Sequence, residues 1–254
     1  MQTTKSKGVT MKLILGDCIE KMKDIPDNSI DMVLCDPPYG TTACKWDSII
    51  PLEPMWEQLE RVIKPNGAIV MTAAQPFTTT LIASNMKMFK YCWVWQKNIA
   101  TGHLNAKKMP MKNHEDILVF YSKQPTYNPQ GVREFNKVVK RGSNGGCYGK
   151  SGSENLQELT GYPRTVQQFK SESKTVLPTQ KPVALMEYLI KTYTNEGETV
   201  LDFAAGSFTT AIACLNTKRN FIGIELDDYY FEVGTKRVNE HLKTLDYAPK
   251  IKTG

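Results

Sequence analysis

The sequence predicts an α/β fold in which a doubly wound, mostly parallel sheet carries an irregular basic insertion. Three observations support this class. Short apolar runs alternate with helix-like segments at both ends of the chain, as in a parallel sheet whose strands are followed by helices. The periodicity fades only in the middle, between residues 124 and 175. With 254 residues and no internal repeat, the chain is long enough for one such domain with an insertion.

Apolar runs and prolines define the expected elements of the first half. The expected strands lie at residues 12–15, 30–35 and 68–72. A brief helix should end near Lys23, and apolar residues recur at helical spacing from 52 to 63. We expect the second helix to stop at Pro65-Asn66-Gly67 and a third helix to begin at Pro76.

The second half starts with aromatic runs at 91–95 and 117–121, which have the composition of strands. Residues 141–153 are rich in glycine and serine, which is typical of flexible chain. The irregular middle is therefore expected to be an insertion and not a separate core. The later expected elements are a helix opened by Pro182, strand 199–203, helix 209–216, strand 221–226 and a terminal amphipathic helix.

Positive charge is concentrated in the middle of the chain. The formal net charge is +6, whereas the stretch from Lys97 to Thr175 holds 13 Lys or Arg and 6 Asp or Glu, a difference of +7. A basic insertion on a nearly neutral scaffold suggests a polyanionic partner such as nucleic acid. A solvated loop region is the alternative interpretation of the same pattern.

Cysteine spacing and the absence of long apolar runs indicate the cell compartment. The six cysteines form no C-x-x-C pair and no ligand-like spacing with the three histidines, so we expect reduced core thiols and no metal site. No apolar run reaches the about 20 residues of a membrane span, and the N-terminus has no apolar signal core. These features predict a soluble, cytoplasmic protein.

The run Asp36-Pro37-Pro38-Tyr39 directly follows the apolar strand 30–35. Two consecutive prolines exclude a helix there, so the strand should end in a rigid, exposed turn. The turn would present a carboxylate, a proline carbonyl and an aromatic ring at the carboxyl edge of the sheet, where open α/β folds bind ligands. These groups suit a planar base with an exocyclic amine, whose protons the two acceptors would take.

A second candidate turn covers residues 202–207, between a predicted strand and a helix opened by Thr209. It is either a ligand-binding turn or an ordinary strand–helix connection. Glu225, about twenty residues further on, would accept the ribose hydroxyls of a nucleoside, or would cap the following helix. Asp17 would meet an adenine edge or act as a plain N-cap. Because no phosphate-binding glycine motif is present, these features favour a nucleoside cofactor without a phosphate chain.

Together, four features resemble the amino-group DNA methyltransferases that depend on S-adenosylmethionine: Asp36-Pro37-Pro38-Tyr39, Pro178-Thr179-Gln180-Lys181-Pro182, the turn at Gly206, and Glu225. The order, with the D-P-P-Y turn first and the cofactor turn last, resembles the β group of these enzymes. Aspartate at position 36 resembles the adenine-N6 members, since cytosine-N4 members usually carry serine there. The resemblance implies a Rossmann-like methyltransferase fold.

The resemblance also divides the chain and assigns its sites. It implies a catalytic half at 11–97, an inserted target-recognition region at 98–176 and a cofactor-binding half at 177–246. The implied catalytic residues are Asp36, Pro37, Pro38 and Tyr39. The implied cofactor-binding residues are Asp17, Asp36, Thr179, Gln180, Lys181, Asp202, Phe203, Ala204, Ala205, Gly206, Ser207, Phe208, Thr209, Glu225 and Leu226. Candidate DNA contacts in the basic insertion are Lys107, Lys108, Lys112, Lys137, Lys140, Arg141, Lys150 and Arg164.

The function implied by the resemblance is methyl transfer from S-adenosylmethionine to N6 of a flipped adenine in double-stranded DNA. The enzyme would be solitary, or part of a restriction–modification or phage system, and a homodimer is compatible with the β group. Cytosine-N4 DNA methylation, RNA methylation, and a nucleic-acid-binding module with a decayed cofactor site are the alternatives. A dehydrogenase is disfavoured because the glycine turn suits a pyrophosphate poorly and the D-P-P-Y turn offers no acid for hydride transfer.

Three positions depart from the family pattern. Phe208 stands where members carry a second glycine, and it would be costly if the position needs a positive φ or close backbone approach to the cofactor. Ala204 stands where many members have a bulkier residue, and Leu177 replaces a frequent histidine. His114-Glu115 is interpreted as a hydrogen-bonding pair at a strand start. The aromatic residues Trp93, Trp95, Phe120 and Tyr121 are expected to belong to the core.

Overall fold

The computed structural model describes residues 1–6, 8–42, 44, 47–140, 154–172, 175–177 and 179–246. The chain divides into two compact units. The larger contains Met1–Asn128 and Thr165–Gly254, and the smaller contains Pro129–Arg164. The division at 97/98 and 176/177 that the resemblance implies remains a prediction.

The larger unit is built on one mixed sheet, which has nine strands among the described residues. In order across the sheet these are β1 (Gln2–Ser6), β2 (Val9–Leu15), β11 (Asn220–Glu225), β10 (Thr199–Asp202), β3 (Ile30–Cys35), β4 (Ile63–Ala73), β6 (Lys112–Phe120), β5 (Phe89–Thr101) and β9 (Val166–Gln168). The central strands β2, β11, β10, β3 and β4 are parallel to one another. Strands β1 and β6 join them in the antiparallel sense. The predicted fold class, a doubly wound and mostly parallel sheet, is confirmed.

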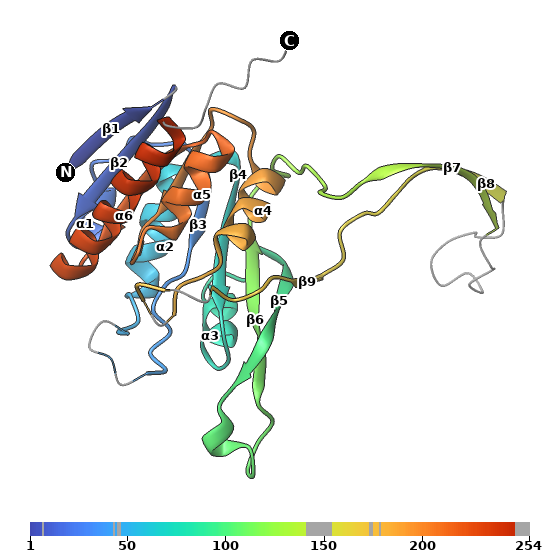
Figure 1. Cartoon of the computed structure of the whole chain (residues 1–254), viewed down its shortest axis with the longest axis horizontal. Coiled ribbons are helices and arrows are strands. Elements are labelled where there is room, and N and C mark those ends of the chain that lie inside the picture. The colour runs from blue at the N-terminus through green and yellow to red at the C-terminus, as the bar shows by residue number, and fades with distance from the viewer. Residues whose placement is uncertain are drawn as a thin grey trace. The chain divides into compact units, whose positions relative to one another are not determined.

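Helices cover both faces of this sheet (Figure 1). One face packs against α1 (Cys18–Met22), α2 (Leu52–Val62) and α3 (Phe77–Ser84), and the other against α4 (Val183–Tyr193), α5 (Thr209–Thr217) and α6 (Asp228–Asp246). Strand β3 shows why both faces are apolar: Met32 and Leu34 belong to one core cluster, while Val33 and Cys35 belong to the other. Successive side chains of a strand point to opposite faces, so a strand buried on both sides reads as one continuous apolar run.

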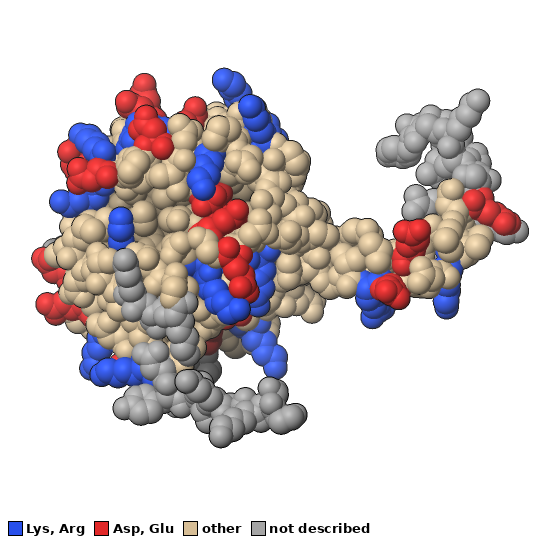
Figure 2. Space-filling view, turned by 90° about the horizontal axis from the view of Figure 1, so that it is seen from above, with Lys and Arg blue, Asp and Glu red and all other residues tan. Residues whose placement is uncertain are grey.

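The smaller unit is a hairpin of β7 (Arg133–Lys140) and β8 (Glu154–Thr160), paired in the antiparallel sense. The prediction of an irregular middle was wrong for these strands and for β9. Their side chains are mostly exposed, so neither strand needs the alternating apolar pattern by which strands are found. Figure 2 shows both acidic and basic side chains on this hairpin. The described charges are mixed: Arg133, Glu134, Lys137, Glu154, Glu158 and Arg164.

Several element boundaries also differ from the prediction. Strand β1 was not predicted, because its sequence is polar and it lies at the sheet edge. Helix α2 ends at Val62, and Pro65-Asn66-Gly67 lies inside β4 instead of stopping the helix. Strands β5 and β6 run well past their aromatic cores. Together with the 3₁₀ helix η1 (His103–Asn105), these extensions form a long hairpin (Figure 1).

The predicted core residues are buried. Trp93, Trp95 and Phe120 are at most 4% exposed, and Tyr121 is partly buried. Of the cysteines, Cys18, Cys35 and Cys214 are buried free thiols, Cys92 is a partly buried one, Cys44 is exposed, and Cys147 lies outside the described residues. In the part of the chain that the structure describes, no helix is long and apolar enough to cross a membrane.

Candidate active site

The predicted catalytic turn and the main cofactor-binding candidates lie along one edge of the sheet. Strands β2, β11, β10, β3 and β4 are adjacent and parallel, so their carboxyl ends form a row. The ends of the first four strands carry, in that spatial order, Asp17 after β2, Glu225 as the last residue of β11, Gly206 after β10 and Asp36 after β3. The chain runs outward in opposite directions from β10 and β3, which makes their junction a topological switch point, the usual ligand site of such sheets.

The carboxyl group of Asp36 is held by hydroxyl donors from two elements. Its Oδ1 accepts hydrogen bonds from the Tyr39 hydroxyl at 2.7 Å and from the hydroxyl of Thr72 in β4. The Tyr39 ring stacks on Phe77, with centroids 5.5 Å apart. Burial, and then the charges of Asp36 and Glu115, raise the pKa of Tyr39 well above its usual range, so its hydroxyl remains a donor. The turn is less exposed than predicted, because Pro37 is buried and Asp36, Pro38 and Tyr39 are only partly exposed.

A second layer of charges surrounds the other oxygen of Asp36. The Nζ atom of Lys181, which is 5% exposed, lies 2.6 Å from Asp36 Oδ2 and 3.2 Å from Glu115 Oε2. Lys97 in β5 forms an ion pair with Glu115 Oε1. Burial alone would lower the pKa of Lys181, but Asp36 and Glu115 raise it above its usual value. Burial likewise opposes the charge of Glu115, but Lys181 and Lys97 lower its pKa below the usual value. Both groups are therefore charged at neutral pH.

Most of this network was not predicted from the sequence. Lys181 was expected among the cofactor residues, and His114-Glu115 was expected to be only a hydrogen-bonding pair at a strand start. Glu115 is instead part of β6 and is ion-paired on both sides. Of the neighbours of Lys181, Thr179 is exposed, and Gln180 accepts a hydrogen bond from the Val176 N–H at 3.3 Å. Pro178 lies outside the described residues.

The turn between β10 and α5 bends back toward Glu225. Gly206 has a φ of +50°, and a Cβ atom there would meet only Leu177 Cδ1, at 3.2 Å. The N–H of Gly206 donates to Glu225 Oε2 at 2.7 Å, and the N–H of Asp227 donates to Glu225 Oε1 at 2.9 Å. Glu225 thus does bond to the start of the next helical segment, as the capping alternative expected. Because each carboxylate oxygen has two lone pairs, it keeps acceptor capacity for a ligand. Leu226 beside it is 69% exposed.

Phe208 adopts the left-handed conformation that the family glycine would favour, with a φ of +55°. Its ring is fully buried and packs edge-on against Phe221 and Phe231, at centroid distances of 6.3 and 5.9 Å. Two glycines make room for it: a Cβ atom on Gly223 would lie 2.7 Å from the ring, and one on Gly234 would overlap it. A left-handed residue costs roughly 1–2 kcal/mol, whereas burying a Phe side chain contributes about 1.5–3 kcal/mol. The core packing therefore offsets the strain.

Several predicted cofactor residues form hydrogen bonds inside the protein that hold the turn between β10 and α5. Asp202 is 3% exposed and accepts hydrogen bonds from Thr210 Oγ1 at 2.7 Å and from the Ala204 N–H at 3.3 Å. Burial raises its pKa to about 7, against the effect of these donors. Arg237 of α6 donates to the Ser207 carbonyl at 3.0 Å and to Thr209 Oγ1 at 2.9 Å. No sequence motif marked Arg237, because its partners lie about 30 residues earlier, in the turn and at the start of α5.

Two further aspartates fix loops at this edge of the sheet. Asp17 is the N-cap of α1 and accepts from the Glu20 N–H at 3.1 Å, as the capping alternative expected. Asp47, which was not predicted, accepts from the N–H groups of residues 40, 41 and 42 at 2.8, 2.9 and 2.6 Å. Hydrogen bonds from this segment outweigh burial and lower the pKa of Asp47. Residues 40–42, which follow Tyr39, are thereby tied to Asp47.

The candidate DNA contacts lie in both units. Lys107, Lys108 and Lys112 are exposed on the hairpin of β5 and β6. In the smaller unit, the Nζ atom of Lys137 lies 5.4 Å from the centroid of the Phe135 ring. Lys140 ends β7 and Arg164 ends the unit, while Arg141 and Lys150 lie outside the described residues.

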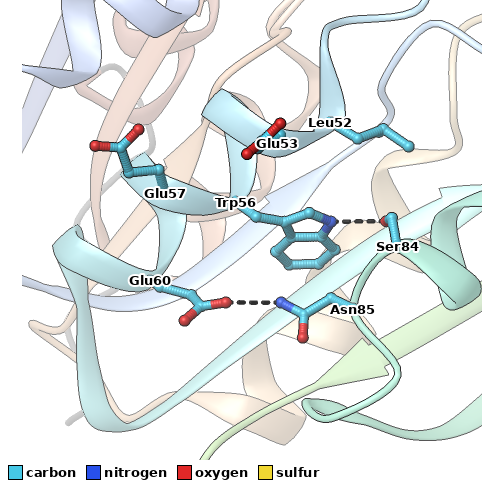
Figure 3. Close-up of a pocket in the computed structure, with 7 residues that line it drawn as sticks. All are labelled: Leu52, Glu53, Trp56, Glu57, Glu60, Ser84 and Asn85. Carbon is cyan, nitrogen blue, oxygen red and sulfur yellow. Dashed lines mark hydrogen bonds between the residues drawn. The ribbon is translucent and has the colours of Figure 1, made fainter.

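A separate hollow lies between α2 and α3 (Figure 3). Trp56 Nε1 donates to Ser84 Oγ at 2.8 Å, and Asn85 Nδ2 donates to Glu60 Oε1 at 2.8 Å, so these polar groups are satisfied. Glu53 and Glu57 add negative charge to its lining. None of the predicted site residues lines it, and its acidic character is unfavourable for a nucleic acid.

The site combines the Asp36 carboxyl group and the Tyr39 ring with the turn at Gly206 and with Glu225 at the end of β11. This combination is the one expected of an amino-group methyltransferase. Residues 30–236 match the family model described as N6_N4_Mtase, DNA methylase, and the chain belongs to that family. It is 30% identical to the DNA adenine methyltransferase YhdJ of Escherichia coli (strain K12) over 268 residues, covering 95% of this chain and 88% of the relative. It is 28% identical to the type II methyltransferase M.HpaI of Haemophilus parainfluenzae, covering 92% and 76%.

Solved structures agree with this assignment. The chain matches the crystal structure of an M1.HpyAVI–SAM complex with a TM-score of 0.63 and 26% identity, covering 89% of this chain and 99% of the other. The cytosine-N4-specific PvuII DNA methyltransferase matches with a TM-score of 0.67 at 13% identity, over 92% of both chains. At that identity the match shows a common fold only.

Proposed function

We propose that this protein transfers a methyl group from S-adenosylmethionine to N6 of an adenine flipped out of duplex DNA. The observation that carries the proposal is Asp36, a carboxyl group at the end of β3, placed beside the turn of β10 by the pairing of those two strands. Serine in its place would offer a hydroxyl, which both donates and accepts. A carboxylate offers acceptors only, which suits an exocyclic amine, and the assignment to adenine follows the resemblance of Asp36 to the adenine-N6 members of the family.

The residues at the strand ends fit the cofactor. Glu225 offers acceptors to the ribose hydroxyls, and exposed Leu226 offers an apolar surface to the adenine ring. A Cβ atom on Gly206 would meet only the side chain of Leu177, and the ring of Phe208 does not approach the cofactor turn from outside, because it is in the core. Asp17 remains a candidate for the adenine edge. When bound, S-adenosylmethionine supplies an electrophilic methyl group on a positively charged sulfur.

The protein's own groups would activate the target amine by orientation. The lone pair of an adenine amine is delocalised into the ring, so the amine is a poor nucleophile. Hydrogen bonds from N6 to the Asp36 carboxylate and the Pro37 carbonyl favour a pyramidal nitrogen with a localised lone pair. Much of the rate acceleration comes from holding N6 and the methyl carbon roughly 3–3.5 Å apart, and from fixed acceptors in a site that excludes water. The proton leaves after the transfer, so Asp36 need not be a strong base.

Flipping the adenine costs a few kcal/mol, which contacts to the extruded base must offset. Tyr39 is the candidate for stacking on that base, a contact worth on the order of 1–3 kcal/mol. The exposed lysines of the β5–β6 hairpin and of the smaller unit are candidates for phosphate contacts. A homodimer is compatible with the β group and stays a prediction. The inward ring of Phe208 weakens the argument for a decayed cofactor site.

The test is methyl transfer from labelled S-adenosylmethionine to unmethylated genomic DNA, followed by mass spectrometry of the nucleosides. The proposal predicts N6-methyladenine. N4-methylcytosine would leave the enzyme class intact but refute the assignment based on Asp36. DNA binding without any transfer would favour the binding-module alternative.

A further inference from the structure

A cationic, apolar arm extends from the catalytic cluster past the carboxyl edge of the sheet (Figure 1). We define the arm as residues 98–114, which join the ion-paired residues Lys97 and Glu115. The register pairs Ala73, the last residue of β4, with Asp116 of β6. The arm therefore begins where β4 ends, on the side of the sheet edge that carries Asp36.

The arm has an unusual surface. It contains Lys107, Lys108 and Lys112 but no Asp or Glu. It also exposes large apolar side chains, with exposed fractions of 64% for Ile99, 88% for Leu104, 53% for Met109 and 40% for Met111. Clustered exposed apolar side chains mark interaction sites, and a purely cationic setting selects a polyanion as the partner.

We propose that the arm enters the DNA duplex beside the target and that Leu104 or Met109 fills the space that the flipped adenine vacates. This inference rests on the proposed function. At about 3.3 Å per residue, the three residues from Glu115 to Lys112 already reach roughly 10 Å, more than the ~8.5 Å depth of the major groove. Apolar side chains inserted between bases are a general means of deforming a duplex, and the lysines would neutralise phosphates.

The experiment uses two duplexes that carry the modified sequence, which is first mapped on genomic DNA treated with the wild-type protein. In one duplex the target adenine is paired with thymine, and in the other it faces an abasic position. Single-turnover methylation is measured for Leu104→Ser and Met109→Ser. Met86→Ser is the matched control, because Met86 is a similarly exposed methionine (61%) before the other end of β5.

The variant that removes the filling side chain, Leu104→Ser or Met109→Ser, should lower the rate on the paired duplex about tenfold, because filling the stack assists flipping. Its rate should stay within about twofold on the abasic duplex. Met86→Ser should stay within about twofold on both. Equal losses on both duplexes, or arm variants that match the control, would overturn the inference. A wild-type protein that methylates no DNA would refute the proposed function instead.

Different contacts carry a second inference, which concerns the buried charges. Lys181 lies between two carboxylates, Asp36 Oδ2 at 2.6 Å and Glu115 Oε2 at 3.2 Å, and faces the Tyr39 ring at 5.6 Å. Lys97 pairs with the far oxygen of Glu115. The substrate amine must compete with Lys181 for an acceptor on Asp36. When the amine takes the place of Lys181 at Asp36, the buried ammonium of Lys181 needs another carboxylate partner. Without one, leaving this charge buried would cost much free energy.

We infer that Glu115 and Lys97 are positioning residues: Glu115 keeps Lys181 paired when the amine replaces it at Asp36 Oδ2, and Lys97 fixes Glu115. This also rests on the proposed function. Asp116→Asn is the matched control, since Asp116 neighbours Glu115 on β6 and accepts from Thr78 Oγ1 at 2.7 Å. The readouts are kcat on genomic DNA as a function of pH, the Kd for S-adenosylmethionine and the Tm.

Glu115→Gln should lower kcat about tenfold with the cofactor Kd unchanged within threefold. Removing a carboxylate lowers the pKa of Lys181, so the alkaline limb of the kcat profile should move to lower pH. Lys97→Gln removes a nearby positive charge and should move that limb to higher pH. A purely structural role would lower Tm in both variants without opposite pH shifts. That result, or a kcat for Glu115→Gln equal to that of Asp116→Asn, would overturn the inference.

Discussion

At the scale of single residues, the site depends on how each acceptor is held. Asp36 receives hydroxyl donors on one oxygen and an ammonium on the other, so its orientation is fixed before a base arrives. Fixed acceptors need no reorganisation during the reaction, which is the main source of electrostatic catalysis. Tyr39 supports Asp36 with its hydroxyl and offers its ring to the base.

We expect Tyr39→Phe to keep substantial activity, since Thr72 and Lys181 still hold Asp36. Tyr39→Ala should lose activity roughly five- to 150-fold, because stacking on the extruded base is worth on the order of 1–3 kcal/mol. Steady-state methylation of genomic DNA by both variants is the measurement. Equal losses would mean that the hydroxyl, and not the ring, is what the reaction needs.

Phe208 should contribute to stability rather than to cofactor contact. Removing a buried Phe side chain costs about 3–5 kcal/mol, and a glycine at positive φ regains roughly 1–2 kcal/mol. Phe208→Gly should therefore lower the free energy of unfolding by about 1–4 kcal/mol in urea titrations, with the cofactor Kd within about threefold. A variant as stable as the wild type that binds cofactor much more tightly would contradict this role.

Asp202 should make stability depend on pH. Its pKa is about 7 in the folded protein, against an ordinary value of 3.8. Between these values the folded state binds more protons than the unfolded state, so the free energy of unfolding should fall as pH rises from 4 to 7. Asp202→Asn should flatten that decline in urea titrations at pH 5 and pH 7. Parallel pH dependence in the two proteins would show that Asp202 does not titrate in this range.

At the scale of elements, strand ends and helices combine to form the site. The central strands β3 and β10 were predictable, because burial on both faces requires continuous apolar runs. Strands β7 and β8 were not, because their exposed side chains follow no apolar pattern. The role of Glu115 was equally hidden, since its partners Lys97 and Lys181 come from other elements. Motifs identified the turns, but only packing shows which side chains face inward.

Helix α6 should act on cofactor binding through Arg237, which braces the turn at Ser207 and Thr209. Hydrogen bonds to charged groups contribute about 1.5–3 kcal/mol each. We expect Arg237→Met to weaken cofactor binding about tenfold by calorimetry, while DNA binding is unchanged. Lys236→Met is the control, because Lys236 is its exposed neighbour. Equal affinities of the two variants for S-adenosylmethionine would show that cofactor binding does not depend on the hydrogen bonds from Arg237 to the turn.

At the scale of the whole molecule, two chain segments meet at the switch point of one sheet. Asp36 comes from the first half of the chain and Lys181 from the second, 145 residues later, yet their side chains touch. The family match spans both segments, from residue 30 to residue 236. The order of the motifs along the chain was readable from the sequence. The meeting of the two segments at Asp36 required the fold.

The role of Asp36 can be measured by comparing methyl transfer to genomic DNA by the wild type and Asp36→Ala, with nucleoside mass spectrometry and cofactor calorimetry on both proteins. We predict N6-methyladenine from the wild type, none from Asp36→Ala, and similar cofactor affinity for the two proteins. N6-methyladenine formed by Asp36→Ala at a rate near that of the wild type would contradict the central claim that this carboxyl group directs the transfer.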